Sequence, residues 1–182
     1  MKDRRVRKTE QAIQAAFAKL LSEKSMENIT VKHLCETADI NKSTFYLHYK
    51  DIYDCADCLR DAIVDELSAV FAPYNFAEII ANFSLILETI MDIFEKNREL
   101  YMPYLKSPSL SSSLCKIKQL ILEKVLARVD DNDRSNEICR CTVSFVISGI
   151  IGVLEQHEFA EIKQQAILAL ADKVQNGFAC HQ

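Results

Sequence analysis

The sequence predicts an all-α protein of about nine helices, in which a three-helix head of the helix-turn-helix type precedes a larger helical domain. Three observations favour this class. The 182 residues include only three glycines and three prolines, apolar residues recur at helical spacing almost throughout, and no run of alternating β-branched residues stands out. A chain of this length holds one or two domains. We expect the head at residues 1–50, with its motif at about 31–50, and the second domain at 51–182.

The first predicted element is an amphipathic helix from about Val6 to Lys24. Its apolar residues fall on one face, so we expect it to pack across the next two helices as core. They are Ile13, Ala16, Phe17, Leu20 and Leu21.

Two short helices are predicted next, on either side of a tight turn. Thr30 can cap the first, at about 31–37, and Asn41 the second, at about 42–49. Asp39 and Ile40 leave room only for a turn between them. The inward positions are Val31, Leu34, Cys35 and Ala38 in the first helix, and Phe45 and Tyr49 in the second.

The outward face of the second short helix combines cationic, hydroxyl and aromatic side chains. Such a set donates to phosphate oxygens and base edges and makes apolar contact with thymine methyls. This pattern is how a helix-turn-helix addresses DNA. The residues are Lys42, Ser43, Thr44, Tyr46, Leu47 and His48, with Lys50 at the end.

The remaining apolar patterns predict the second domain's helices in order. A long helix covers about 51–71, with Asp51 favoured at its positive end. Asn75 and Glu78 resemble a capping box that opens one helix running to about Phe94. Further elements are expected at about 101–105, 111–129, 135–157 and 159–176, with Ser107 and Pro108 as a helix start and a polar break at 130–133.

The helix at 135–157 is too apolar all round for an exposed helix. Ser144, Ser148 and Gly152 follow one another at i, i+4 and i+8, and this smooth strip lets another backbone approach closely. One interpretation is close packing inside the monomer. The interpretation that we favour is a self-complementary dimer face made of Ser144, Ile147, Ser148, Ile151 and Gly152.

Charge is distributed unevenly along the chain. The formal charge is −4, yet residues 1–50 hold ten Lys/Arg and six Asp/Glu and therefore carry +4. A polyanion would be attracted to this end and repelled by the rest. The longest nearly uncharged apolar run, 143–154, is shorter than the roughly 20 residues of a membrane span. With no pattern of a secretion signal, we expect a cytoplasmic protein without a membrane partner.

The seven cysteines fit a reducing compartment better than a disulfide framework. Cys55 and Cys58 form a C-x-x-C that could bind a metal or form a redox couple, but a second ligand pair at zinc-site spacing is missing. We therefore expect no metal and no cofactor. Without a Gly-rich phosphate loop, a nucleophile motif or paired histidines, an enzyme is not expected either.

The segment ITVKHLCETADINKSTFYLHYKDIYD resembles the head of the tetracycline-repressor (TetR/AcrR) family of bacterial regulators. The agreement covers about residues 5–60, and NRELY at 97–101 is similar to the effector-domain type common in Firmicutes members. The matching positions are Thr30, Val31, Leu34, Ala38, Ile40, Thr44, Phe45, Tyr46, His48 and Tyr49.

Four positions depart from the family pattern. Asp39 replaces the usual turn glycine, at a cost of about 1 kcal/mol in the left-handed conformation. Cys35 replaces alanine and Asn41 replaces a serine cap, and both preserve the local role. Ile52 stands where the family usually has a lysine that holds a phosphate, which implies weaker DNA binding or a greater share for Lys50 and the N-terminal arm.

The resemblance implies a homodimeric transcriptional regulator, most often a repressor, that binds a palindromic double-stranded operator and is released by an effector in the C-terminal domain. By position, Lys42, Ser43, Tyr46 and Leu47 would face base edges, and Thr30, Thr44, His48 and Lys50 would face phosphates. The effector is unknown, with a hydrophobic or aromatic molecule favoured. Candidate lining residues, for which core packing is the alternative, are Phe83, Met91, Phe94, Tyr101, Met102 and Tyr104.

Two other functions stay open for the same fold. A co-regulator could sense a partner protein in place of a small molecule, which would suit weak DNA binding at Ile52. A thiol-based redox sensor could use Cys55 and Cys58 or the remaining thiols.

Overall fold

The computed structural model describes residues 4–107, 111–127, 137–156, 169 and 172–173. All regular structure in these residues is helical, so the predicted all-α class is confirmed. The chain divides into two compact units, one of residues 1–63 with 97–117 and the other of 64–96 with 118–182. The predicted functional division at residue 50 stays a prediction.

The head is built on a long first helix. Helix α1 spans Arg4–Glu23 and packs against α2, Val31–Ala38, after the short 3-10 turn η1 at Met26–Asn28. Helix α3 follows at Lys42–His48 and contacts α2. All five apolar residues predicted for the first stripe are buried, and the core of the head is completed by Ala18, Leu34, Cys35, Phe45 and Tyr49.

The turn between α2 and α3 has the backbone that its sequence predicts. Asp39 has φ 54° and ψ 48°, and it is the one non-glycine residue with positive φ in the described chain. Its backbone N–H donates to the Cys35 carbonyl, and the Ile40 N–H reaches the same carbonyl at 3.0 Å. The left-handed residue therefore ends α2 and turns the chain toward α3.

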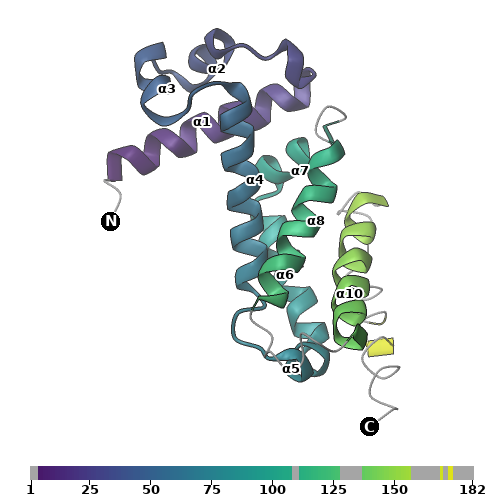
Figure 1. The fold of residues 1–182 in the computed structure, drawn as a ribbon. Helices are drawn as coiled ribbons and strands as arrows, with labels where there is room; N and C mark the ends of the chain where they lie inside the picture. Colours follow the sequence, from purple (N-terminus) through teal and green to yellow (C-terminus); the bar gives the residue numbers. More distant parts are fainter. Residues whose placement is uncertain (1–3, 108–110, 128–136, 157–168, 170–171, 174–182) are drawn as a thin grey trace. The chain divides into compact units, whose positions relative to one another are not determined.

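The rest of the first unit comes from three further helices. These are α4 (Ile52–Ala69), α7 (Arg98–Leu105) and α8 (Ser111–Leu126). The first unit contains all of α7 but only the start of α4 and of α8. Helix α7 packs against α1 (Figure 1), and its Tyr101 and Tyr104 are buried. The short piece predicted around 101–105 is thus an eight-residue helix, which begins earlier than expected.

The second unit contains the rest of α4 and α8, with α5 at Phe76–Ala81, α6 at Phe83–Lys96 and α10 at Glu137–Gln156. The capping box opening α5 is confirmed. The Asn75 N–H donates to Glu78 Oε2 at 2.9 Å, and the Glu78 N–H donates to Asn75 Oδ1 at 3.0 Å.

The single helix predicted from Asn75 to about Phe94 is wrong, because the structure divides it at Asn82. The Asn82 side-chain amide donates to the Glu78 carbonyl at 2.8 Å, and its own carbonyl accepts from the Ile86 N–H at 3.0 Å, as the residue preceding a helix does. Asparagine favours helix starts because its side chain competes for backbone groups. The apolar stripe survives the division, with Ile79, Phe83, Ile86, Leu87, Ile90 and Phe94 buried.

Several predicted features lie outside the described residues. They are Pro108, residues 128–129 of the helix expected to reach 129, the polar break at 130–133 and most of the final helix expected at 159–176. In the described parts of the chain, no helix has the length and apolar character needed to cross a membrane.

Candidate nucleic-acid interface

Helix α3 and the residue that follows it bury two aromatic side chains, and the helix exposes one aromatic and one aliphatic side chain. Phe45 is fully buried and Tyr49 is 5% exposed, whereas Tyr46 is 58% and Leu47 83% exposed. The Phe45 and Tyr46 rings meet edge to face, with centroids 5.4 Å apart. Burying Phe45 fixes the rotation of the helix, so Tyr46 and Leu47 must project outward.

The first turn of α3 is organised around one oxygen. Asn41 Oδ1 accepts hydrogen bonds from the Thr44 backbone N–H at 2.7 Å, from Ser43 Oγ at 2.6 Å and from Thr44 Oγ1 at 2.9 Å. The predicted cap is confirmed, and so is Thr30, whose hydroxyl accepts from the His33 N–H at 3.2 Å. Lys42 and Ser43 are exposed beside this cap.

The segment after α3 is held by two aspartates. The Lys50 N–H donates to Asp54 Oδ2 at 2.8 Å, and the Asp54 N–H donates to Asp51 Oδ1 at 2.8 Å. Asp51 therefore caps α4 with its carboxylate at the positive helix end. The Lys50 side chain stays exposed.

His48 differs from the other predicted contact residues because its side chain is only 10% exposed. Its Nδ1 lies 3.5 Å from Oε1 of Glu10, a carboxylate of α1 whose side chain is 24% exposed. The sequence reasoning missed Glu10. A signal was present, since Glu10 precedes Ile13 by three residues and Phe17 by seven and so continues the buried stripe of α1.

The start of α4 carries no cation at the position where the family resemblance implies one. Ile52 is 6% exposed and belongs to the core of the first unit, while the neighbouring Tyr53 is 63% exposed. Asp51 is exposed, and Asp54 is half-buried. A phosphate approaching this helix start would meet carboxylates in addition to the helix dipole.

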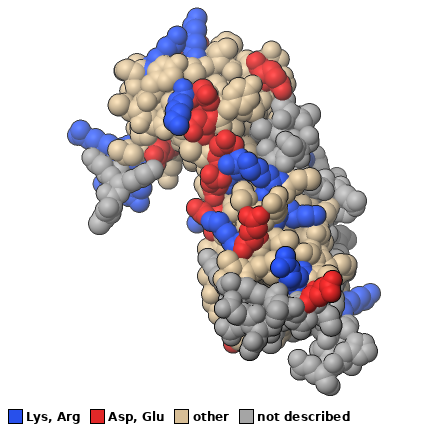
Figure 2. Space-filling view, viewed as in Figure 1, with Lys and Arg blue, Asp and Glu red and all other residues tan. Residues whose placement is uncertain are grey.

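Lys and Arg side chains lie at the surface of the helices of the head on the face drawn in Figure 2, with acidic side chains among them. The sequence places +4 on residues 1–50. Such a surface favours a polyanion over a neutral partner.

The six predicted effector-lining residues divide between the two units. Phe83, Met91 and Phe94 belong to one, and Tyr101, Met102 and Tyr104 belong to the other. The aromatic residues are at most 6% exposed, whereas Met91 and Met102 are half-buried. A shared pocket stays a prediction.

The predicted dimer strip is partly accessible on α10. Ser144, Ser148, Ile151 and Gly152 are half-buried, and Ile147 is 3% exposed. A Cβ built at Gly152 or at Gly149 would meet no described atom within 4 Å. Close packing against the described part of the same chain therefore does not explain these glycines.

The C-x-x-C pair is split between interior and surface. Cys55 is fully buried, and burial raises the pKa of its thiol to about 12. Cys58 is exposed, and its pKa is also raised, mainly by burial and then by nearby carboxylates. Both groups therefore stay as thiols at neutral pH. Within the described residues no cluster of three or more metal-ligating side chains occurs.

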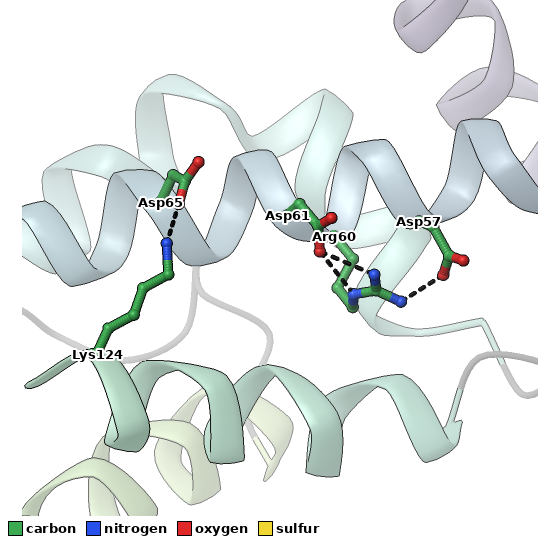
Figure 3. A network of polar contacts seen from close by, with 5 residues as sticks. All are labelled: Asp57, Arg60, Asp61, Asp65 and Lys124. Atoms are coloured by element: carbon green, nitrogen blue, oxygen red, sulfur yellow. Dashed lines mark hydrogen bonds and ion pairs between the residues drawn. The ribbon is translucent and has the colours of Figure 1, made fainter. Parts of the chain in front are cut away.

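Two cations engage the carboxylates farther along α4 (Figure 3). Arg60, only 8% exposed, donates to Asp57 and to Asp61, the latter at 2.8 and 3.0 Å. In the second unit, Lys124 of α8 donates to Asp65. These carboxylates are engaged by cations of the chain itself.

Comparison with protein-family models and with curated proteins finds no match for this chain. The resemblance of the head therefore rests on its own residues.

Proposed function

We propose that this chain is a dimeric transcriptional regulator, a repressor that binds a palindromic operator and leaves it when an effector occupies the C-terminal domain. The observation that carries the proposal is which side chains α3 buries and which it exposes. A seven-residue helix is capped, is pinned by a fully buried Phe45, and exposes Tyr46 and Leu47 beside Lys42. Large apolar side chains exposed on a rigid helix of a basic head suit contact with base edges.

In this proposal α3 lies in the major groove. Lys42, Ser43, Tyr46 and Leu47 address the bases, because they project from the exposed face and the first turn. Phosphate contacts come from Thr30, Thr44, His48 and Lys50. Two heads held about 34–36 Å apart would reach successive grooves, and an effector acts by binding two head spacings with different affinity.

The dimer is supported by the glycines of α10. Two glycines cost about 1 kcal/mol each inside a helix, and no described atom of the chain lies close enough to need them. A second copy that approaches along Ser144, Ser148 and Gly152 would use the space that they leave.

The test is a fluorescence-anisotropy titration with DNA from upstream of the protein's own gene, at two salt concentrations. Lys42→Ala, Tyr46→Ala and Leu47→Ala should each weaken binding by about 1–3 kcal/mol. Leu85→Ala is the matched control for Leu47→Ala, because Leu85 is a 51% exposed leucine outside the head. Equal losses for both leucine variants would contradict the assignment of α3 as the reading helix.

A second candidate is a co-regulator of the same fold that needs a partner protein to hold DNA. The observation in its favour is the start of α4, where Ile52 is buried and Asp51 and Asp54 supply negative charge. The purified dimer alone would then bind its promoter no more tightly than random DNA. A redox sensor at Cys55 and Cys58 receives no such support, because the thiolate is the reactive form and both cysteines of this pair have raised pKa values.

A further inference from the structure

Helix α1 contacts the end of α3 through Glu10 and His48. His48 is the residue whose imidazole contacts a phosphate in the proposed function. His48 Nδ1 lies 3.5 Å from Glu10 Oε1, and both side chains are largely withdrawn from solvent, at 10% and 24% exposure. Both residues belong to the same compact unit. At this burial the pair is screened less than an exposed ion pair would be.

Glu10 is the carboxylate that the structure places against His48 Nδ1. Tyr49, at the end of α3, has its ring centroid 6.2 Å from that of His48, and its pKa is raised by burial. From α4, Cys58 lies near Glu10 and its pKa is also raised, so Tyr49 and Cys58 both stay neutral near pH 7. Three carboxylates of α4 lie near the same thiol, and they are Asp54, Asp57 and Asp61. Helix α2 presents Cys35 to Lys42, at the opposite end of α3.

Hydrogen-bond chemistry then limits what His48 can do. A neutral imidazole has one N–H and one acceptor nitrogen, whereas a carboxylate and a phosphate both only accept. If Nδ1–H faces Glu10, a neutral ring offers Nε2 as an acceptor, which a phosphate oxygen cannot use. Only the imidazolium can donate to Glu10 and to a phosphate at once.

We propose that Glu10 is a positioning residue for DNA binding: it holds His48 by Nδ1, directs Nε2 at a backbone phosphate, and makes that contact depend on uptake of a proton. This inference rests on the proposed function and deepens it. Because binding takes up a proton, affinity for DNA falls as pH rises, by up to about tenfold per pH unit for each head.

The substitution Glu10→Gln separates this role from a structural one. A glutamine amide can donate to Nδ1, so a neutral ring keeps its N–H on Nε2 and reaches the phosphate without an added proton. We expect a flattened pH profile, with affinity in mildly alkaline buffer equal to or above that of the wild type. A purely structural role for Glu10 would instead lower affinity at every pH.

The experiment is a titration of a short random-sequence duplex at low, constant ionic strength in mildly acid and mildly alkaline buffer. Random sequence suffices because phosphate contacts do not depend on sequence. His48→Gln should bind DNA with an affinity that does not change with pH and that is weaker than the wild type in acid. Adding Glu10→Gln to His48→Gln should leave that pH dependence unchanged. Glu23→Gln is the matched control, since Glu23 is an exposed glutamate of the same helix. It should raise affinity slightly through its charge and keep the wild-type slope.

A second measurement on the full-length protein needs no DNA. Nitrogen-15 NMR of the imidazoles, with His48 assigned by His48→Gln, should show the proton on Nδ1 in the wild type and on Nε2 in Glu10→Gln under mildly alkaline conditions. An unchanged tautomer, or a wild-type pH slope in Glu10→Gln, overturns the inference. Absence of DNA binding by every variant, including the wild type, would count against the proposed function, and the tautomer would still decide whether Glu10 orients His48.

Discussion

Asp54 accepts a hydrogen bond from the backbone N–H of Lys50 at 2.8 Å, so the segment leaving α3 is tied to the first turn of α4. Asp51 completes the link by accepting from the Asp54 N–H at 2.8 Å. The side chains of two aspartates therefore accept hydrogen bonds from two backbone N–H groups between the end of α3 and the first turn of α4.

Replacing Asp54 with alanine should lower the free energy of unfolding by about 1 kcal/mol, because the Lys50 N–H loses its partner and the helix start loses a favourable charge. Urea denaturation followed by circular dichroism measures the change. Asp57→Ala is a useful comparison, since the mostly exposed Asp57 contacts a side chain and no helix-end amide. A loss no larger than for Asp57→Ala would contradict the role given to Asp54.

The turn before α3 offers a stabilising change. Asp39→Gly should raise the free energy of unfolding by about 0.5–1 kcal/mol, because glycine adopts φ 54° without the steric cost of a Cβ. Asp39→Ala should lower it, since alanine lacks a polar side chain to bond locally. Thermal melts of the three proteins in one buffer give the order, and a glycine variant less stable than the alanine variant would refute the argument.

Stability at alkaline pH should report the buried thiol of Cys55. Its pKa rises from 9.0 to about 12 on folding, so the unfolded chain releases this proton first. Stability is fully present below about pH 9 and falls as pH rises toward 12, by about 1.4 kcal/mol per pH unit for this group. Urea titrations at several pH values should show a shallower fall for Cys55→Ala than for the wild type. Cys115→Ala, at an exposed cysteine of the same unit, should keep the wild-type dependence.

The contact between Lys124 and Asp65 should contribute little to the free energy of unfolding. Both side chains are well exposed, at 44% and 67%, and exposed pairs stabilise by about 0–1 kcal/mol. Lys124→Met should therefore change the free energy of unfolding by less than about 1 kcal/mol, with a smaller effect at high salt. A loss above about 2 kcal/mol would show that the pair acts as a buried one.

Local chemistry is what the sequence predicts well here. Four features depend only on residues within four positions along the chain, so residue type and spacing suffice. They are the caps at Thr30 and Asn41, the carboxylate of Asp51 at the start of α4 and the left-handed Asp39. The buried positions of α1 and α3 follow from helical periodicity for the same reason.

The features that the sequence does not predict are of two kinds. Some depend on contacts between segments that are distant in the chain, and others on two local structures of nearly equal stability. Glu10 reaches His48 across 38 positions, and a half-buried glutamate has no pattern that names its partner. The packing of α7 on α1 is equally remote in sequence. At Asn82 one helix and two helices differ by the preference of a single side chain, which periodicity does not register.

The cap of α3 has a consequence for the thermodynamics of the proposed complex. Ser43 and Thr44 already donate their hydroxyl hydrogens to Asn41 Oδ1 in the free protein. Both hydroxyl hydrogens are therefore already bonded before DNA arrives. A new bond from either hydroxyl to DNA replaces one acceptor with another, with little gain in enthalpy. Discrimination between operators would then come from Lys42, Tyr46 and Leu47, and burial of the two apolar side chains should give association a negative change in heat capacity.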